Sequence, residues 1–226
     1  MTAIMTPQSP ILFRADAGPQ LGIGHLMRCL AIAQATKASG RTAIFLSDIQ
    51  SPELRTRLQS EGFEMSRPYE QPGTPEDAKA TTDLARQVGA DWIVADGYRF
   101  MEPFQERIKA AGFKLLLVDD YGHAHRYFAD IILNQNIDAP EDPYRHREMG
   151  SKLLIGSKYV LLRREFVEWR KREIQETGDA ERLLITMGGS DSANVSLKVW
   201  DAIQSIRGRA LECKFVIGAA NSTEGD

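Results

Sequence analysis

Short apolar runs alternate with amphipathic segments along most of this chain. Six apolar runs have the length of strands, and four segments between them repeat their apolar positions with helical spacing. Strands that alternate with helices build βαβ units, and continuous apolar strands are covered by helices on both faces. We therefore predict a parallel-sheet α/β domain. The predicted strands are 11–14, 42–46, 62–65, 92–95, 114–118 and 129–133, and the helices are 24–39, one that begins at 51, 74–88 and 102–111.

A second, shorter α/β pattern follows a strongly charged helical segment at residues 165–176. It comprises a strand at 182–186, a glycine loop at 187–191, a helix at 192–206 and a strand at 211–217. Such a unit is too small to cover both faces of a sheet. We predict a Rossmann-like sugar-side domain at 1–163, a connecting helix at 164–180, and at 181–226 the start of a nucleotide-binding domain that we expect to be truncated.

Composition excludes several classes of protein. The 226 residues carry a net charge of -3, which gives no basic surface for nucleic acid. The N-terminal residues lack the features of a signal peptide, and no run reaches the ~18 apolar residues of a membrane span, so we expect a cytoplasmic protein. Two distant cysteines, Cys29 and Cys213, exclude a disulfide framework. Cys29 lies in an apolar helical pattern and is expected to be buried and inert. We expect no metal, no cofactor and a monomer.

The first motif that could take part in catalysis or binding joins the first strand to the first helix. It begins with Arg14 and Asp16 and ends with Gly22-Ile23-Gly24-His25. Ligands of open α/β sheets bind outside the carboxyl ends of the strands, so this loop is well placed. A partly positive helix N-terminus favours a neutral imidazole, the form that a general base requires. The alternative is a tight glycine turn with His25 as a polar residue at the helix start.

Three further motifs follow predicted strands. Asp96-Gly97-Tyr98 could face the same crevice or form a simple turn. The adjacent Asp119 and Asp120 could bind a metal or sugar hydroxyls, but successive side chains diverge, so a cap and a solvated acid are preferred. Amides in the Asn134-Gln135-Asn136 segment could hydrogen-bond a neutral sugar or satisfy their own loop.

The last motif is the glycine loop of the second pattern. Gly188, Gly189 and Ser190 lie between a strand and a helix. Backbone N–H groups at a helix N-terminus suit a diphosphate. The spacing is not that of a P-loop. An ordinary turn, with Ser190 or Asp191 as the helix cap, explains the loop equally well.

Taken in order, these motifs resemble one family. They resemble the UDP-2,4-diacetamido-2,4,6-trideoxy-β-L-altropyranose hydrolases of pseudaminic acid biosynthesis, and the match spans nearly the whole chain. The matching segments are Arg14-Ala15-Asp16, Gly22-Ile23-Gly24-His25, Arg28-Cys29-Leu30, Asp96-Gly97-Tyr98, Asp119-Asp120, Leu133-Asn134-Gln135-Asn136, Gly156-Ser157-Lys158-Tyr159, Arg163-Arg164-Glu165-Phe166 and Met187-Gly188-Gly189-Ser190-Asp191.

The resemblance implies a GT-B-like fold of two Rossmann-like domains, related to the MurG-like transferases. It implies metal-independent release of UDP from a UDP-activated diacetamido sugar, with His25 activating water and inversion at the anomeric carbon. Tyr98 is then expected beside the sugar. The expected substrate contacts are Arg14, Asp16, Gly22, Gly24, Tyr98, Asn134 and Asn136, and the expected diphosphate contacts are Gly188, Gly189 and Ser190.

Two other functions stay open at this stage. A transferase of the same fold would move the sugar to an acceptor instead of water. A non-catalytic module would only bind the nucleotide sugar. The motifs do not distinguish pseudaminic-type from legionaminic-type sugars. Because uridine contacts in this fold belong to the second domain, residues 1–226 alone are expected to bind UDP weakly and to turn over little substrate.

Overall fold

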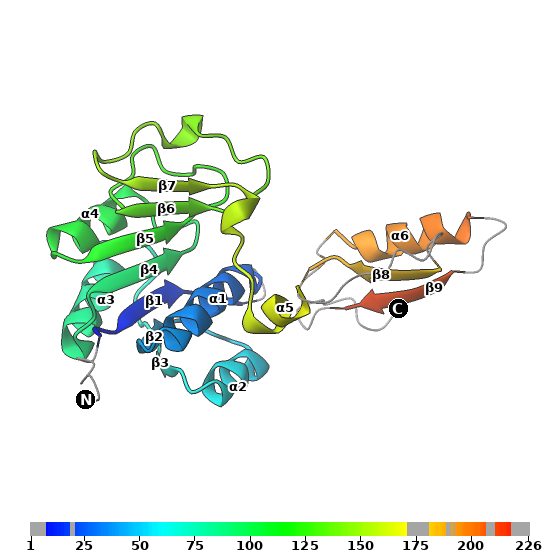
Figure 1. Cartoon of the computed structure of the whole chain (residues 1–226), viewed down its shortest axis with the longest axis horizontal. Coiled ribbons are helices and arrows are strands. Elements are labelled where there is room, and N and C mark those ends of the chain that lie inside the picture. The colour runs from blue at the N-terminus through cyan, green and yellow to red at the C-terminus, as the bar shows by residue number, and fades with distance from the viewer. Residues whose placement is uncertain are drawn as a thin grey trace, which may run out of the picture.

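A computed structural model describes residues 8–18, 21–170, 181–188, 191, 193–206 and 211–217. A parallel seven-stranded sheet forms the larger part of the molecule (Figure 1), with strand order β3-β2-β1-β4-β5-β6-β7. Its strands are β1 (Ile11–Ala15), β2 (Ala43–Leu46), β3 (Glu64–Ser66), β4 (Trp92–Asp96), β5 (Lys114–Val118), β6 (Ile131–Asn134) and β7 (Lys152–Ile155).

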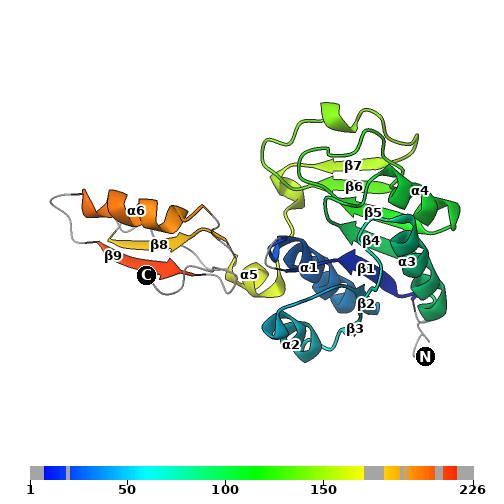
Figure 2. The same ribbon diagram turned by 180° about the vertical axis from the view of Figure 1, so that it is seen from behind.

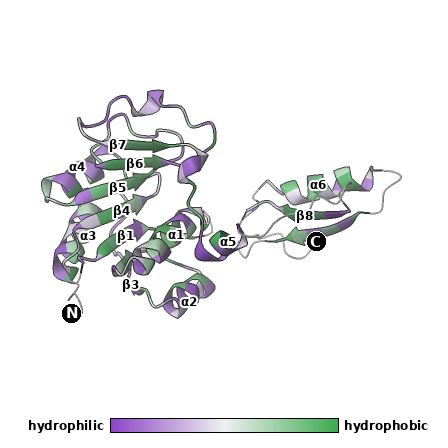
Figure 3. Ribbon diagram, viewed as in Figure 1, coloured by the Kyte–Doolittle hydropathy of each residue, from purple (hydrophilic) through white to green (hydrophobic). Residues whose placement is uncertain are grey.

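Helices cover both faces of this sheet, as the continuous apolar strands predicted. On one face pack α1 (Gly24–Ala38) and α2 (Pro52–Ser60), and on the other α3 (Pro75–Val88) and α4 (Glu102–Ala110). Successive strand residues point to opposite faces. Thus Leu12 belongs to the core under α3 and α4, whereas Phe13 belongs to the core under α1. Figure 2 shows the same layers from behind, and Figure 3 shows the apolar strands within them.

Side-chain caps begin two of the helices where the sequence predicted them. The Ser51 hydroxyl accepts a hydrogen bond from the Leu54 N–H at 3.2 Å, and proline occupies the first turn. The Thr74 hydroxyl accepts the Asp77 N–H in the same way at 3.2 Å. Gly89 then ends α3 with a left-handed φ of 71°.

The sheet contains one strand that the sequence prediction missed. Strand β7 pairs with β6 at the edge of the sheet, and its residues are only partly buried. Its apolar run is only Leu153-Leu154-Ile155, shorter than the roughly four to eight residues that indicate a buried strand. The described part of the predicted charged helix is α5 (Arg164–Trp169), and the predicted continuation over residues 171–180 lies outside the described part of the chain.

The second α/β pattern forms a separate small sheet (Figure 1). Strands β8 (Arg182–Thr186) and β9 (Glu212–Val216) are parallel neighbours, and α6 (Val195–Gln204) connects them. Apolar side chains on this unit are exposed, among them Leu184 at 68% and Trp200 at 44%. Among the described helices, none combines the length and apolar character needed to cross a membrane.

Candidate active site

Five polar side chains meet at the carboxyl edge of the large sheet. His25 and Arg28 come from the start of α1, Asp96 ends β4, Tyr98 follows it, and Asp120 follows β5. Strand order reverses between β1 and β4, the position at which open α/β sheets bind ligands. These five residues, which we call the His25 cluster, therefore lie at the switch point.

His25 is 7% exposed and contacts a fully buried carboxylate. Its Nδ1 lies 2.7 Å from Asp96 Oδ1 and 3.0 Å from Arg28 Nη2. A carboxylate only accepts a hydrogen bond and a guanidinium only donates one, so Nδ1 can serve one of them. The shorter contact assigns the proton to Nδ1, which donates to Asp96. That tautomer leaves the lone pair on Nε2, as a general base requires.

Arg28 joins two carboxylates of the cluster. Its Nε donates to Asp96 Oδ2 at 2.8 Å and its Nη2 to Asp96 Oδ1 at 2.7 Å, while Nη1 donates to Asp120. Burial alone would raise the pKa of Asp120, but the Arg28 guanidinium holds that pKa below its usual range. Asp120 therefore stays ionised as a fixed acceptor. Bidentate pairing to Asp96 also fixes the carboxylate that orients His25.

Tyr98 packs its ring against His25. The two ring centroids are 4.7 Å apart in an edge-to-face arrangement, and the Tyr98 hydroxyl donates to Asp120 Oδ2 at 2.9 Å. Burial, with the hydrogen bond to Asp120, raises the pKa of Tyr98 to about 12. The phenol therefore stays protonated at neutral pH. Because 44% of Tyr98 is exposed, its ring also presents a surface beside His25.

The two asparagines hydrogen-bond the backbone of Asp120, a residue of the cluster. The Asn134 side chain is fully buried, and its Nδ2 donates to the Asp120 carbonyl and to the Tyr144 hydroxyl, each at 2.8 Å. Asn136 is exposed, and its Nδ2 donates to the same carbonyl at 2.9 Å. Asn134 thus orders the loop after β5. This is the alternative to a sugar contact that the sequence left open. Of the two asparagines, only Asn136 is an exposed residue.

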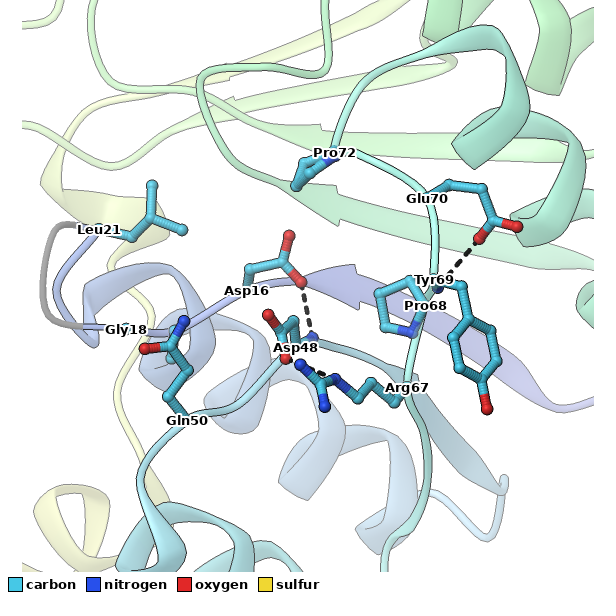
Figure 4. A pocket seen from close by; sticks show the side chains of 11 residues that line it. Asp16, Gly18, Leu21, Asp48, Gln50, Arg67, Pro68, Tyr69, Glu70 and Pro72 are labelled. Carbon is cyan, nitrogen blue, oxygen red and sulfur yellow. Dashed lines mark hydrogen bonds and ion pairs between the residues drawn. The ribbon is translucent and has the colours of Figure 1, made fainter.

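Arg14 takes a place different from the substrate contact predicted for it. It has no exposed surface, and its guanidinium donates to Asp16 at 2.6 Å and to Asp77 at 2.8 Å. Successive side chains of β1 point to opposite faces of the sheet, and Arg14 therefore points into the core under α3, where it contacts only other protein groups. Arg14 therefore positions neighbouring groups in this structure. Asp16 is 6% exposed and lines a cavity (Figure 4).

The glycines of the first loop provide backbone conformation and open space. Gly22 has a φ of +71°, a region that favours glycine, and it exchanges backbone hydrogen bonds with Gly18. Gly24 is the first residue of α1, and a Cβ there would meet nothing within 4 Å. In the second unit Gly188 has a φ of +79°, whereas the predicted diphosphate contacts Gly189 and Ser190 lie outside the described residues.

Sequence reasoning placed Asp96 at the crevice, with a simple turn as the alternative, but named no partner for it. For the Asp119-Asp120 pair a cap and a solvated acid were preferred, whereas Asp120 pairs with Arg28 and only 18% of its side chain is exposed. Arg28 was named only within a family motif. Arg28 lies one turn after His25, so the two share a helix face. That spacing was the available signal.

Asp119 is a structural carboxylate. Its Oδ1 accepts the N–H groups of Tyr121 and Gly122, and its Oδ2 accepts the Tyr127 hydroxyl at 2.6 Å. Burial opposes ionisation, yet His123 and Tyr127 lower the pKa of Asp119. In the described ranges no three His, Cys, Asp or Glu side chains group as metal ligands. Cys29 is fully buried, and burial raises the pKa of its thiol, as expected for an inert cysteine.

Comparison with curated proteins finds two relatives, while no family model matches the chain. An uncharacterised protein of Methanocaldococcus jannaschii is 23% identical over 207 residues, which cover 90% of this chain and 41% of that protein. The UDP-2,4-diacetamido-2,4,6-trideoxy-β-L-altropyranose hydrolase of Campylobacter jejuni is 26% identical over 191 residues, 84% of this chain and 64% of the hydrolase. The chain thus spans less than two thirds of either relative.

Solved structures share the fold. MurG of Acinetobacter baumannii superposes with a TM-score of 0.53 and 13% identity, covering 92% of this chain and 60% of MurG. A glycosyltransferase of Rickettsia africae gives a TM-score of 0.50 and 14% identity with the same coverage. The predicted α/β, GT-B-like class is therefore confirmed, and so is the resemblance to the diacetamido-sugar hydrolases.

Proposed function

We propose that this chain carries the catalytic base of a hydrolase that releases UDP from a UDP-activated 2,4-diacetamido-2,4,6-trideoxy sugar. The observation that carries the proposal is the contact between His25 Nδ1 and the buried Asp96 at the switch point of the sheet. The likeness to the Campylobacter hydrolase supports the substrate class. The coarser function, processing of a nucleotide sugar, has the support of both the relative and the fold.

The proposed reaction needs one base and no protein acid. His25 Nε2 takes a proton from water as the water oxygen bonds to the anomeric carbon. The bond from that carbon to the β-phosphate oxygen breaks, and its electron pair leaves with UDP. Attack opposite the leaving group inverts the anomeric centre. A diphosphate is a weak base, so its departure does not require protonation.

Release of UDP without any added acceptor tests the proposal. Full-length protein would be incubated with UDP-2,4-diacetamido-2,4,6-trideoxy-β-L-altropyranose, and both UDP and the free sugar would be quantified. Proton NMR of the first-formed sugar would report whether the anomeric centre inverts. Stoichiometric UDP and free sugar support hydrolysis. Absence of UDP release from this substrate and from its legionaminic-type isomer would overturn it.

A sugar transferase is the second candidate, because the superposed structures include MurG and a glycosyltransferase. A transferase would release UDP quickly only when an acceptor is present. Addition of a candidate acceptor, with mass spectrometry of the products, separates the two reactions. UDP release that depends strictly on the acceptor would favour the transferase.

Replacement of Tyr98 by phenylalanine is expected to lower activity less than loss of His25 does. The hydroxyl donates to Asp120 and does not transfer the key proton, so its loss affects positioning. A neutral-to-charged hydrogen bond is worth ~1.5–3 kcal/mol, an upper limit for this exposed side chain. Steady-state kinetics of the Tyr98→Phe enzyme would measure the effect. Unchanged kcat and unchanged KM would contradict a role beside the sugar.

Chelation of metal ions is expected to leave turnover unchanged. The carboxylates nearest His25 are occupied, Asp96 and Asp120 by Arg28 and Asp119 by Tyr127 and backbone N–H groups. A divalent ion would have to displace these partners. Initial rates would be compared before and after dialysis against EDTA. Activity that is lost and then restored by Mg²⁺ or Mn²⁺ would contradict the expectation.

A further inference from the structure

The connection between the two α/β units begins at α5, which lies between the large sheet and the small one (Figure 1). Residues 163–166 form one of the motifs of the sequence, yet the proposed reaction gives them no task. Helix α5 has six residues, and an isolated helix of that length is unstable in water. Its N-cap residue, Arg163, makes no side-chain capping hydrogen bond. The start of α5 therefore depends on partners from other elements.

Gln34 of α1 caps α5 from a distant part of the chain. Gln34 is 8% exposed, and its Oε1 accepts a hydrogen bond from the Arg164 N–H at 2.7 Å. Arg164 is the first residue of α5, where backbone N–H groups have no partner within the helix. Gln34 thus supplies the cap that Arg163 lacks, from 130 residues earlier in the chain.

Glu61 fixes the direction of the Gln34 amide. Gln34 Nε2 donates to Glu61 Oε2 at 2.9 Å and to Oε1 at 3.0 Å. Because a carboxylate only accepts hydrogen bonds, the amide nitrogen faces Glu61 and the amide oxygen faces α5. The Glu61 side chain is 9% exposed, and its Oε1 also accepts from Arg57 Nε at 2.7 Å. The Gln34 oxygen is therefore a preorganised acceptor.

An outer pair of charges adds to this anchor. Glu165 Oε1 accepts from Arg57 Nη2 and from Arg163 Nε, each at 3.0 Å. The Arg57 and Glu165 side chains are 43% and 38% exposed, and exposed ion pairs contribute little stability. Loss of the buried Gln34 amide would leave the Arg164 N–H without this acceptor and Glu61 with fewer donors, which costs more. Gln34 is therefore the main anchor of α5.

A second glutamine holds the chain just before α5. Gln135 Oε1 accepts a hydrogen bond from the Leu161 N–H at 2.7 Å, and the Leu161 side chain packs against the core under α1. Gln135 lies between Asn134 and Asn136, the two residues that hydrogen-bond the Asp120 carbonyl. The chain at 161–164 is thus bound to α1 and to the segment after β6, the same elements that hold the His25 cluster.

We propose that Gln34 and Gln135 are positioning residues: they fix where the chain leaves the first domain and thereby align the second unit with the His25 cluster. Helix α1 carries His25 in its first turn and Gln34 nine residues later, about 14 Å along one rigid helix. The catalytic side chain and the start of α5 thus belong to one body. The inference rests on the proposed function, because alignment matters for a substrate that contacts both units.

Replacement of either glutamine by leucine in the full-length protein tests the alignment. We expect kcat/KM for UDP-2,4-diacetamido-2,4,6-trideoxy-β-L-altropyranose to fall about 10- to 100-fold, because a displacement of about 1 Å at the reacting centre has an effect of this size. The Kd for UDP alone should stay the same, since the uridine contacts are expected in the second unit. Gln59→Leu is the matched control, because Gln59 is an exposed glutamine on α2, and it should change neither constant.

Conservative variants separate these hydrogen bonds from general stability. Gln135→Glu keeps an acceptor for the Leu161 N–H and should retain most of kcat/KM. Gln34→Glu places two carboxylates together and should lose activity. Gln34→Glu combined with Glu61→Gln reverses the pair, so that the carboxylate at position 34 accepts from both the Arg164 N–H and the amide at position 61. This double variant should regain most of the loss.

Unchanged kcat/KM in the leucine variants would overturn the inference. So would a double variant that regains nothing, or equal losses of UDP binding and turnover. UDP release by the wild-type protein is measured separately, so none of these results touches the proposed function.

Distances between spin labels test the alignment without catalysis, and they decide the inference even if the wild-type protein releases no UDP. Labels would be attached through Asp83→Cys on α3 and Lys198→Cys on α6, two exposed positions, in a background without reactive cysteines that includes Cys213→Ser. Wild-type and Gln59→Leu proteins should give the same distance distribution, and Gln34→Leu a broader one. The same distribution for Gln34→Leu and wild type would overturn the inference.

Discussion

Replacement of His25 by glutamine or leucine is expected to lower turnover by about 10²–10⁴-fold, the usual effect of removing a general base. Glutamine can still hydrogen-bond Asp96 but cannot take a proton from water, so the loss should appear in kcat. Affinity for the UDP-sugar should change little, because the nucleotide contributes most of the binding energy. Rapid-quench turnover and calorimetric binding of the same variants would separate the two effects.

His125→Leu is the control for this experiment, since the His125 residue is exposed and its described bond runs from its backbone N–H to Glu102. It should leave both turnover and binding unchanged. Wild-type turnover by His25→Leu would remove His25 as the base. Equal losses of binding and turnover would make His25 a contact to the ground-state substrate instead.

Replacement of Asp96 by asparagine is expected to give the second largest loss. Asp96 is fully buried and accepts from His25 and from Arg28, so it fixes the imidazole tautomer without touching solvent. The equivalent change in a Ser-His-Asp triad lowers kcat ~10⁴-fold because the wrong tautomer forms. We expect a fall of at least about 10²-fold in kcat with a nearly constant KM, since a residue that acts through His25 alters the chemical step and not substrate contacts.

Asp130→Asn controls for the loss of a bonded carboxylate at the opposite ends of the strands, where Asp130 pairs with Lys109 and accepts the Leu115 N–H. It should retain kcat. Thermal unfolding of both variants would show whether Asp96→Asn is folded at the assay temperature. A folded Asp96→Asn enzyme with unchanged kcat would contradict the positioning role.

Much of the fold could be predicted from local pattern. The strand at Lys114–Val118 has the predicted bounds, and the caps at Ser51 and Thr74 start their helices as predicted. These features depend on the conformational propensities of a few adjacent residues, so the sequence alone predicts them. The edge strand Lys152–Ile155 was missed because its apolar run, Leu153-Leu154-Ile155, is shorter than the roughly four to eight residues that indicate a buried strand.

The site was only partly predictable, for a different reason. His25 could be selected because its glycine loop follows a strand and opens a helix, which is a local arrangement. Its partner Asp96 lies 71 residues away, and no pattern within the sequence states which carboxylate a given imidazole meets. Parallel pairing of β1 with β4 brings the two together.

Arg14 is a second residue whose surroundings depend on long-range pairing, and here the tertiary structure removes a predicted site residue from the site. The resemblance to the hydrolase family, whose opening motif includes Arg14, implied a substrate contact there. Alternation along β1 instead turns it under α3, where Asp77 meets it from 63 residues away. The sequence by itself determined the alternation of strands and helices, the caps and the loop that carries His25, because short-range sterics and hydrophobic periodicity govern these. Only the tertiary structure decided which charges are paired and buried and which face a cavity, because burial and long-range pairing depend on how the strands are ordered in the sheet.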